Sequence, residues 1–499
     1  MEKNNKRIIK NTGFLYFRML LLLFISFYTS RILLEKLGIN DFGIYNVVGG
    51  IVAMLSSLRS IFATSTQRFL NIAIGEHNEG QVKKIFGTSL YVNGLICVLF
   101  FIVAEILGVC FLKYKLNIPE ARIFAANIVF QFSVATSLIT IFNISFDAVI
   151  IAYEQMRFYS YISIIEAIMK LGILYLLSYA SVDRLILYSA LLFIVAIANS
   201  TGYIIYCTKV IGVKIQRISI DRNLLQKMLT FSGWNFFGNF MYSLVNEGIN
   251  FLLNIFGGVV LNAARAIAYQ VRNAVMMFLS NMQIAVQPQL VQSYGQSDYT
   301  RFHQLLFLSS RVLFALFILF AMPTFFYTNE ILSLWLTVLP NDASVFIKAL
   351  LIYMMVRSLH GPIDIFFKAY GELKTYQLIE TVMFSLPLIF TYILFKINFP
   401  AYTAFVVMGI VELFNLLLIL FLARKYNRVI FKGYEQVVLG RGFMLLLISF
   451  FVNYFIRMLP ISLIFHLICS FILTASIIFI IAFNGKEKRY LYYAIIRKS

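Results

Sequence analysis

Two arginines inside an apolar segment are the residues in this sequence best suited to bind an anion. Residues 261–286, LNAARAIAYQVRNAVMMFLSNMQIAV, are apolar enough to lie in lipid, yet they include Arg265 and Arg272. The two are seven residues apart, which in a helix is nearly two full turns, so both side chains point the same way. An arginine near the centre of a bilayer costs about 2.5–3.5 kcal/mol on insertion scales. We therefore expect each to face water, an acidic partner or an anionic ligand.

The depth of each arginine in the membrane decides which of these surroundings it can have. If the helix enters the apolar layer at Asn262, a rise of about 1.5 Å per residue puts Arg265 roughly 5 Å inside and Arg272 roughly 15 Å inside, near the middle of a ~30 Å core. Arg265 could then extend its long side chain to the interface. Arg272 is too deep for that, and its alternatives are a buried pair with an acid or a contact with an anionic substrate.

Polar and basic residues on neighbouring segments extend the candidate substrate site. Arg18 and Arg59 fall inside the first two apolar segments, and Glu247 lies beside a polar stripe with helical spacing. The stripe consists of Asn235, Asn239, Ser243, Asn246 and Asn250. One interpretation is hydrogen bonding between helices. The other is a hydrated wall that receives sugar hydroxyls and amides, with Glu247 paired to Arg272 in one state.

Glu412 is the main candidate for coupling or gating. It lies in the middle of an apolar segment without a local charged partner, so we expect it to pair with Arg311 or Arg357.

Residues 360–364, HGPID, supply the other candidates for gating. Asp364 has the i,i+4 spacing of a local ion pair with Lys368, which makes it a secondary candidate. Gly361 and Pro362 adjoin each other and predict a hinge, because proline removes a backbone hydrogen bond from a helix.

The composition is that of a membrane protein. The 499 residues are 61% hydrophobic with a mean hydropathy of +0.84, against about 45–50% apolar residues in soluble domains. The net charge of +20 does not indicate nucleic-acid binding, because the basic residues lie mostly in alternate loops and not between aromatic residues. The four cysteines and four histidines are dispersed, so we expect no disulfide, metal site or cofactor.

Long continuous apolar runs predict an all-α polytopic membrane protein with about fourteen transmembrane helices. The expected spans are 12–34, 43–65, 86–112, 123–151, 158–179, 185–207, 231–256, 262–286, 304–327, 345–369, 376–396, 400–422, 440–457 and 461–483. Basic residues concentrate in alternate connections, and the positive-inside rule then puts both termini in the cytoplasm. The outer loop KYKLNIPEAR, with three basic residues, is an exception.

An internal repeat divides the chain. Shifted by 220 residues, Gly38 aligns with Gly258, and shifted by 217, Asp147 aligns with Asp364. Six helices in each half predict two bundles related by an axis along the membrane normal, with the substrate site between them. We expect a six-helix bundle at 1–207, a cytoplasmic linker at 208–230, a second six-helix bundle at 231–425, and two further helices with a basic tail at 426–499.

Three stretches carry a family resemblance. LGINDFGIYNVVGGIVAML (37–55), NEGINFLLNIFGGVVLNAARAIAYQVRNAV (246–275) and PQLVQSYG (288–295) resemble bacterial polysaccharide (O-antigen-type) flippases of the multidrug/oligosaccharidyl-lipid/polysaccharide exporter superfamily, which has the MATE-like fold. The resemblance implies a flippase in the bacterial cytoplasmic membrane that moves undecaprenyl-pyrophosphate-linked oligosaccharide by alternating access. It also implies that helices 1, 2, 7 and 8 line the cavity, where their arginines would attract the pyrophosphate.

The same resemblance sets the expected partners and the rival functions. Partners would be the lipid-linked oligosaccharide, membrane lipids and other polysaccharide-assembly proteins, with coupling to an H+ or Na+ gradient or to the membrane potential. A cation-coupled multidrug exporter of the same fold is the alternative, although arginines would repel its cationic substrates. A membrane enzyme such as a polymerase or ligase is a further alternative, but no Walker, GxSxG or HExxH pattern occurs, so no catalytic residue is nominated.

Overall fold

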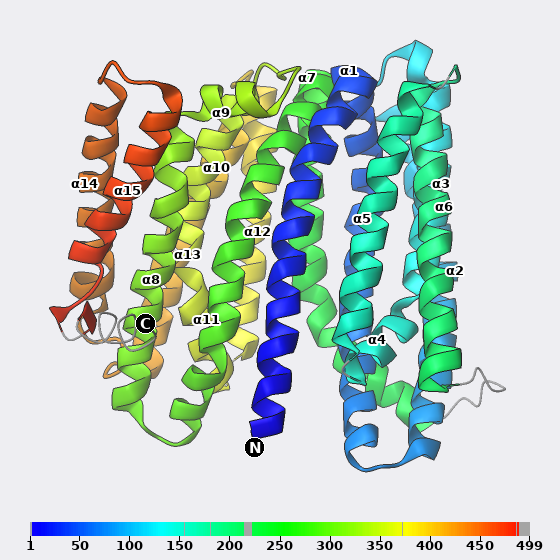
Figure 1. Ribbon diagram of the computed structural model, residues 1–499, viewed down its shortest axis with the longest axis horizontal. Coiled ribbons are helices and arrows are strands. Elements are labelled where there is room, and N and C mark those ends of the chain that lie inside the picture. Colours follow the sequence, from blue (N-terminus) through cyan, green and yellow to red (C-terminus); the bar gives the residue numbers. More distant parts are fainter. Residues whose placement is uncertain are drawn as a thin grey trace. The chain divides into compact units, whose positions relative to one another are not determined.

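The computed structural model describes residues 2–153, 155–179, 181–213, 222–371, 373–485 and 487–488, with side chains except at 2–18, 55–64, 68, 72, 75, 222, 223, 227, 229–240, 284, 285, 288 and 373. Secondary structure in these ranges is entirely helical (Figure 1). Among the described residues, eleven stretches are long and apolar enough to cross a membrane. The predicted all-α, multi-pass fold is confirmed. The number fourteen stays a prediction, because the first two expected spans lie partly outside the described side chains.

The chain packs as two compact units, Met1–Ala266 and Ile267–Ser499. The first contains α1 (Glu2–Gly75), α2 (Glu79–Tyr114), η1 (Glu120–Arg122), α3 (Ile123–Phe142), α4 (Ile144–Ala152), α5 (Met156–Ser178), α6 (Arg184–Ile205), the π-helix η2 (Tyr206–Ile211) and the first arm of α7 (Arg222–Gly295). The division falls inside α7, whereas the four segments proposed from the sequence follow the repeat. Those four segments stay a prediction, because the boundary between two compact units need not coincide with the boundary between two repeats of the sequence.

The second unit begins at Ile267, within the second arm of α7. It continues with α8 (Tyr299–Phe326), α9 (Thr328–Trp335), α10 (Ala343–Arg357), α11 (His360–Tyr370), α12 (Leu373–Lys396), α13 (Thr403–Tyr426), the π-helix η3 (Glu435–Gly440), α14 (Arg441–Arg457) and α15 (Leu463–Ile481). The last two helices pack against each other and against α8.

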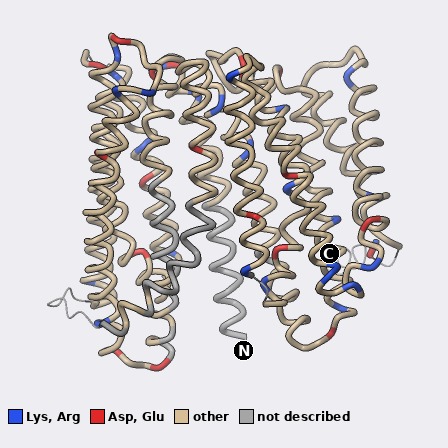
Figure 2. The backbone as a smooth tube through the Cα atoms, turned by 180° about the vertical axis from the view of Figure 1, so that it is seen from behind, with Lys and Arg blue, Asp and Glu red and all other residues tan. Residues whose placement is uncertain are grey.

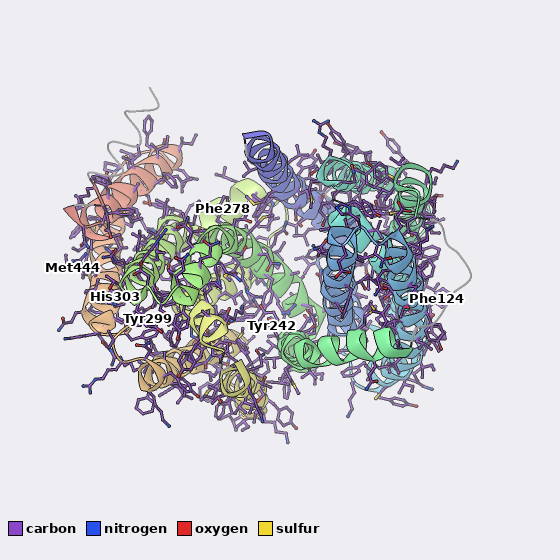
Figure 3. All side chains as sticks on the ribbon, turned by 90° about the horizontal axis from the view of Figure 1, so that it is seen from below. Phe124, Tyr242, Phe278, Tyr299, His303 and Met444 are labelled. Carbon is purple, nitrogen blue, oxygen red and sulfur yellow. The ribbon has the colours of Figure 1, made fainter. Side chains whose placement is uncertain are left out.

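Apolar side chains cover the outside of both units, as expected for surfaces that face lipid. Phe124 on α3 is 73% exposed and Met444 on α14 is 50% exposed, and both point away from the helices of their own unit (Figure 3). Charged residues gather near the ends of the helices, with a smaller number at intermediate depth (Figure 2). Those few internal charges are the candidates for function.

The internal repeat is confirmed at its first helices. The helices α1 and α7 each bend at one glycine with a positive φ, 77° at Gly38 and 74° at Gly258, a conformation that L side chains rarely adopt. The following turns also match, with positive φ at His77 and Ser297. Each of these pairs is separated by 220 residues, and the next residues, Asn78 and Asp298, cap α2 and α8 with their side chains.

The fourth helix of each repeat is broken at the same place. The first half has α3 and α4 on either side of Asn143, and the second half has α10 and α11 on either side of residues 358–359. Asp147 and Asp364 both lie in the short helix after the break. The 217-residue alignment made from the sequence therefore matches a real structural equivalence.

Candidate functional site

The second arm of α1 packs at very close range against the bend of α7 and along its first arm in the first unit. A Cβ added to Gly43 would lie 1.9 Å from the carbonyl oxygen of Val259. One turn further along α1, Asn46 accepts a hydrogen bond at its carbonyl from Nδ2 of Asn250, at 3.3 Å. Ser243 donates to the carbonyl of Ala53 at 3.3 Å. The polar stripe of α7 therefore serves helix packing, the first of the two interpretations, over at least part of its length.

Asparagine side chains join the two arms of α7 around the bend at Gly258. Nδ2 of Asn262 donates to the carbonyl and to Oδ1 of Asn250, both at 2.8 Å. Nδ2 of Asn254 donates to Oδ1 of Asn262 at 2.9 Å, and Oδ1 of Asn254 accepts the backbone N–H of Asn117 at 2.7 Å. These buried amides satisfy one another's hydrogen-bonding groups, and their network therefore fixes the geometry of the bend.

Arg265 belongs to this polar cluster and does not extend to the surface. It is 5% exposed, and its Nη2 donates to the carbonyl of Asn246 at 2.8 Å. The same nitrogen lies 3.7 Å from Oε1 of Glu247. The other carboxylate oxygen of Glu247, Oε2, accepts a hydrogen bond from Asn250 at 3.1 Å. The side chain of Arg265 therefore does not extend to the surface of its unit, and its depth relative to the membrane interface stays a prediction. The acid predicted to pair with Arg272 instead lies beside Arg265 within this unit.

Arg272 lies in the second unit between two tyrosine rings. It is 8% exposed, with its guanidinium carbon 4.8 Å from the ring centre of Tyr269 and 6.0 Å from that of Tyr353. The aromatic faces stabilise a buried cation without neutralising its charge. Because Glu247 belongs to the other unit, its pairing with Arg272 stays a prediction.

Four residues named from the sequence, Arg18, Arg59, Asn235 and Asn239, lie outside the described side chains. The cationic group formed by Arg18, Arg59, Arg265 and Arg272 stays a prediction for that reason.

A buried ionic network occupies the middle of the second unit. Nη1 of Arg357 lies 3.0 Å from Oε1 of Glu412 and 3.3 Å from Oε2 of Glu380. His360 contacts both acids, with Nδ1 3.5 Å from Glu380 and Nε2 3.3 Å from Glu412. Asn415 donates to Glu380 at 2.8 Å. The Arg357 partner expected for Glu412 is confirmed.

The other expected partner of Glu412, Arg311, has different contacts. It donates to both carboxylate oxygens of Glu487, at 2.7 and 3.2 Å, and to the carbonyl of Ala482 at 2.6 Å. Glu487 is outside the spans, and although partial burial raises the pKa of its carboxyl, the hydrogen bond from Arg311 outweighs burial and lowers it. Arg311 thus fastens the segment that follows α15.

Sequence reasoning missed Glu380 and His360. Glu380 lies about one turn inside the expected span 376–396 and has no charged residue one turn away, so it met the part of the criterion for Glu412 that concerns local partners but not the part that concerns depth. His360 carried no signal, because a single histidine beside Gly361 indicates a hinge as readily as an ionic contact.

The gating residues of the HGPID segment adjoin this network. Lys368 pairs with Asp364 at 2.6 Å, as the spacing predicted. Pro362 is in the first turn of α11, where its missing N–H leaves no helical bond unmade. The carbonyl of Gly361 accepts a hydrogen bond from Gln283 of α7 at 3.2 Å. The break between α10 and α11 is therefore tied to the helix that carries Arg272.

The first unit contains a polar cavity of about 490 Å³ at the equivalent break. Asn143, Asp147, Tyr159 and Tyr203 are among its lining residues. At one side, Glu166 binds Lys170 at 2.6 Å, an ion pair between i,i+4 neighbours of α5. No sequence pattern predicted this cavity, because its walls come from five different helical segments.

An ionic cluster at the end of the helices contains Arg122, one of the three basic residues of the loop KYKLNIPEAR. Arg122 donates to both carboxylate oxygens of Asp41, at 2.8 and 2.6 Å, and also binds Asp183. Burial raises the pKa of Asp41 despite this arginine. Burial also acts on Asp183, but hydrogen bonds from Arg122 and the first N–H groups of α6 outweigh it and lower the pKa. The guanidinium of Arg122 therefore binds two carboxylates whose pKa values are shifted in opposite directions.

Comparison with known proteins identifies the fold. Residues 235–393 match the protein-family model described as MatE. A search of curated proteins found no match. A solved structure of an inward-facing multidrug resistance MATE family transporter of the MOP superfamily is similar over 82% of this chain and 95% of its own, with TM-score 0.70 and 13% identity.

A second solved structure matches over a longer part of the chain. The lipid II flippase MurJ, in an inward closed conformation, is similar over 98% of this chain and 100% of its own, with TM-score 0.71 and 11% identity. An outward-facing MATE family transporter covers 84% of this chain with TM-score 0.58 and 14% identity. The chain is a multi-pass membrane protein with the fold shared by MATE transporters and the MurJ flippase.

Proposed function

We propose that this protein flips undecaprenyl-pyrophosphate-linked oligosaccharide across the bacterial cytoplasmic membrane, for the assembly of a surface polysaccharide. The observation that carries the proposal is the burial of Arg265 and Arg272 in one membrane helix. Fixed positive charge is costly in a bilayer and is retained where it has a use. A diphosphate is an appropriate ligand, because guanidinium groups donate paired hydrogen bonds to phosphate oxygens.

Arg272 is the stronger substrate contact of the two in this proposal. Arg265 already donates to the carbonyl of Asn246 and lies beside Glu247, so it organises the bend of α7. Arg272 rests on the faces of Tyr269 and Tyr353, contacts that retain its full charge.

The buried arginines favour a flippase over the drug-exporter alternative in this proposal. The fold itself is common to both functions, since the lipid II flippase is similar over 98% of this chain with TM-score 0.71 and the multidrug transporter over 82% with TM-score 0.70. Cationic drugs would also be repelled by buried arginines. In this proposal an H+ or Na+ gradient or the membrane potential drives transport, both termini are cytoplasmic, and other polysaccharide-assembly proteins receive the product.

Reconstituted protein tests the proposal. Liposomes containing the full chain should flip a fluorescent lipid-pyrophosphate-linked sugar, and efflux of a cationic dye from the same liposomes should be absent. Dye efflux without flipping would favour the drug exporter and overturn the proposal.

Two variants of Arg272 sharpen this test. Arg272→Ala should abolish flipping, and Arg272→Lys should retain part of it, because lysine keeps the charge but loses the forked donor. Arg301→Ala, at the exposed start of α8, is the matched control and should flip normally. Full activity of Arg272→Ala would remove the arginine from the mechanism.

A further inference from the structure

The connection between α13 and α14 carries basic residues that no acidic residue balances. Residues 423–434 contain no acid and four bases, Arg424, Lys425, Arg428 and Lys432. The next residue along the chain, Glu435, pairs with Arg424. The other three bases are exposed, and none of them forms a hydrogen bond or an ion pair with another described residue. Three positive charges are therefore available to a ligand outside the protein.

The backbone that carries these bases is held in place by buried neighbours. Ile430, Phe431 and Tyr434 are buried, and the ring of Phe431 lies 4.9 Å from that of Phe366 in α11, measured between centroids. Nδ1 of His303 in α8 contacts the carbonyl oxygen of Ile430 at 2.7 Å. A connection fixed in this way loses little freedom when a ligand binds to its exposed side chains.

A stripe of exposed apolar residues on α13 leads to the bases. Phe414, Leu417 and Phe421 follow one another at helical spacing and are exposed, Phe421 by 68%. Lys425 comes four residues after Phe421, so it lies on the same face one turn further along. The 24 residues of α13 span about 36 Å, slightly more than a ~30 Å hydrocarbon core. Lys425, at the end of α13, therefore lies at the level of the lipid headgroups.

Exposed apolar residues also follow Lys425 along the chain. Val429, next to Arg428, is 75% exposed, and α14 begins with the exposed residues Phe443 and Met444, the second of which is labelled in Figure 3. Apolar side chains beside bases are typical of segments at a membrane interface, where the apolar group enters the hydrocarbon and the charge stays among the headgroups. The connection therefore offers apolar and cationic contacts to one amphipathic ligand.

We propose that an anionic phospholipid of the surrounding membrane binds here, with an acyl chain along the stripe of α13 and its phosphate among Lys425, Arg428 and Lys432. Bases next to a membrane span attract anionic lipids. The membrane's own phospholipids are the occupant that a lipid-facing helix favours, because they surround it on all exposed sides. The contact residues are exposed, whereas Arg272 is buried. This surface is therefore separate from the proposed substrate contact.

Lipid titration of the purified full chain in detergent tests the proposal. Native mass spectrometry counts the bound lipids as phosphatidylglycerol or phosphatidylcholine with the same acyl chains is added. Phosphatidylglycerol should bind more tightly to the natural protein. Lys425→Ser/Arg428→Ser/Lys432→Ser should bind it about a hundredfold more weakly, because each base near a membrane surface contributes about fivefold. Its affinity for phosphatidylcholine should be unchanged.

Two control variants separate the site from total charge and from folding. Lys83→Ser/Lys84→Ser/Arg301→Ser removes three exposed bases near the starts of α2 and α8 and should bind phosphatidylglycerol as the natural protein does. Lys425→Arg/Arg428→Lys/Lys432→Arg keeps the charges and should retain the affinity. Equal affinity of the natural protein for the two lipids, or an equal loss in the Lys83 control, would overturn the proposal.

Two competing ligands identify the source of the phosphate. Glycerol phosphate, which lacks acyl chains, should not displace phosphatidylglycerol at equal concentration, and displacement would overturn the proposal in favour of a free phosphate. Undecaprenyl pyrophosphate should bind to this surface no more tightly than phosphatidylglycerol. Tighter binding that the Lys425→Ser/Arg428→Ser/Lys432→Ser variant loses would assign the surface to the transported lipid. None of these measurements depends on transport, so their failure would leave the proposed function intact.

Discussion

Gly43 of α1 lies directly against the carbonyl of Val259 in α7, with space for a hydrogen atom and none for a methyl group. The contact lies in the first unit, where α1 packs against α7 immediately beside the bend at Gly258. Backbone approach of this kind is typical of small residues between membrane helices.

Gly43→Ala should destabilise the protein by about 1–3 kcal/mol, because the added methyl group forces two backbones apart. Gly49→Ala is the matched control: a Cβ there meets nothing within 4 Å, and alanine favours the helix by up to about 1 kcal/mol. Thermal unfolding of the purified protein in detergent measures both. Equal midpoints for the two variants would contradict the close crossing.

Asp183→Asn should lower the unfolding temperature at neutral pH, with a loss of about 0.2–1 kcal/mol typical of a partly exposed ion pair, because asparagine keeps the helix cap but loses the charge paired with Arg122. The pKa of Asp183 is lowered in the folded protein. Its stabilisation is therefore fully present above the ordinary carboxyl pKa of about 3.9 and is lost as the pH falls through the lowered folded value. The deficit of Asp183→Asn should accordingly shrink in acid.

Asp41→Asn should be the milder change at neutral pH. The pKa of Asp41 is raised in the folded protein, so the folded state binds its proton more tightly and loses stability as the pH rises through the raised value. Removing that carboxylate relieves this loss and offsets the missing bonds to Arg122. Melting curves at several pH values should separate the two aspartates, and identical profiles would refute the assignment.

Arg311→Ala should loosen the segment after α15 by about 1.5–3 kcal/mol, the usual range for hydrogen bonds to charged groups. Backbone amide exchange at Asn484 should accelerate, because Glu487 accepts that N–H and is itself held by Arg311. Arg424→Ala, which breaks the exposed pair with Glu435, should leave exchange at Asn484 unchanged. Unaltered exchange in Arg311→Ala would show that this attachment is not stabilising.

Single cysteines should report the orientation in a variant without the four native cysteines. Glu76 and Asn341 are exposed and lie in different connections between helices. The distribution of basic loops predicts that a membrane-impermeant thiol reagent reaches Glu76→Cys from the cytoplasm and Asn341→Cys from the outside. Reversed labelling would invert the proposed direction of transport.

The sequence predicted those features that depend on local spacing or on repetition. Gly38 and Gly258 aligned because a positive φ selects glycine at both bends, and Lys368 paired with Asp364 because i,i+4 residues are neighbours on a helix. Arg311 and Arg357 could be named as the alternative partners of Glu412 because a buried acid needs a base and few bases lie inside the spans, and the structure selects Arg357.

What the sequence could not predict depends on contacts between distant helices. Glu247 lies beside Arg265 because the bend of α7 brings its two arms together, and nothing in the spacing distinguished Arg265 from Arg272. The cavity beside Asn143 exists because five helical segments leave a volume unfilled between them. No single residue type in the sequence indicates such a cavity. His360 became notable through Glu380 and Glu412, and each is distant from it in sequence.

The bend at Gly38 has a consequence for how the protein enters the membrane. Helical structure extends along α1 from Glu2 to Gly75, with one glycine in place of a loop. Backbone groups close to such a bend find partners only when both arms are present, and lipid provides none. The two arms should therefore be delivered to the bilayer as one helical hairpin during synthesis, and the same holds for α7. A ribosome paused between the arms would expose an incomplete hairpin, so biogenesis should be most vulnerable at these two points of the chain.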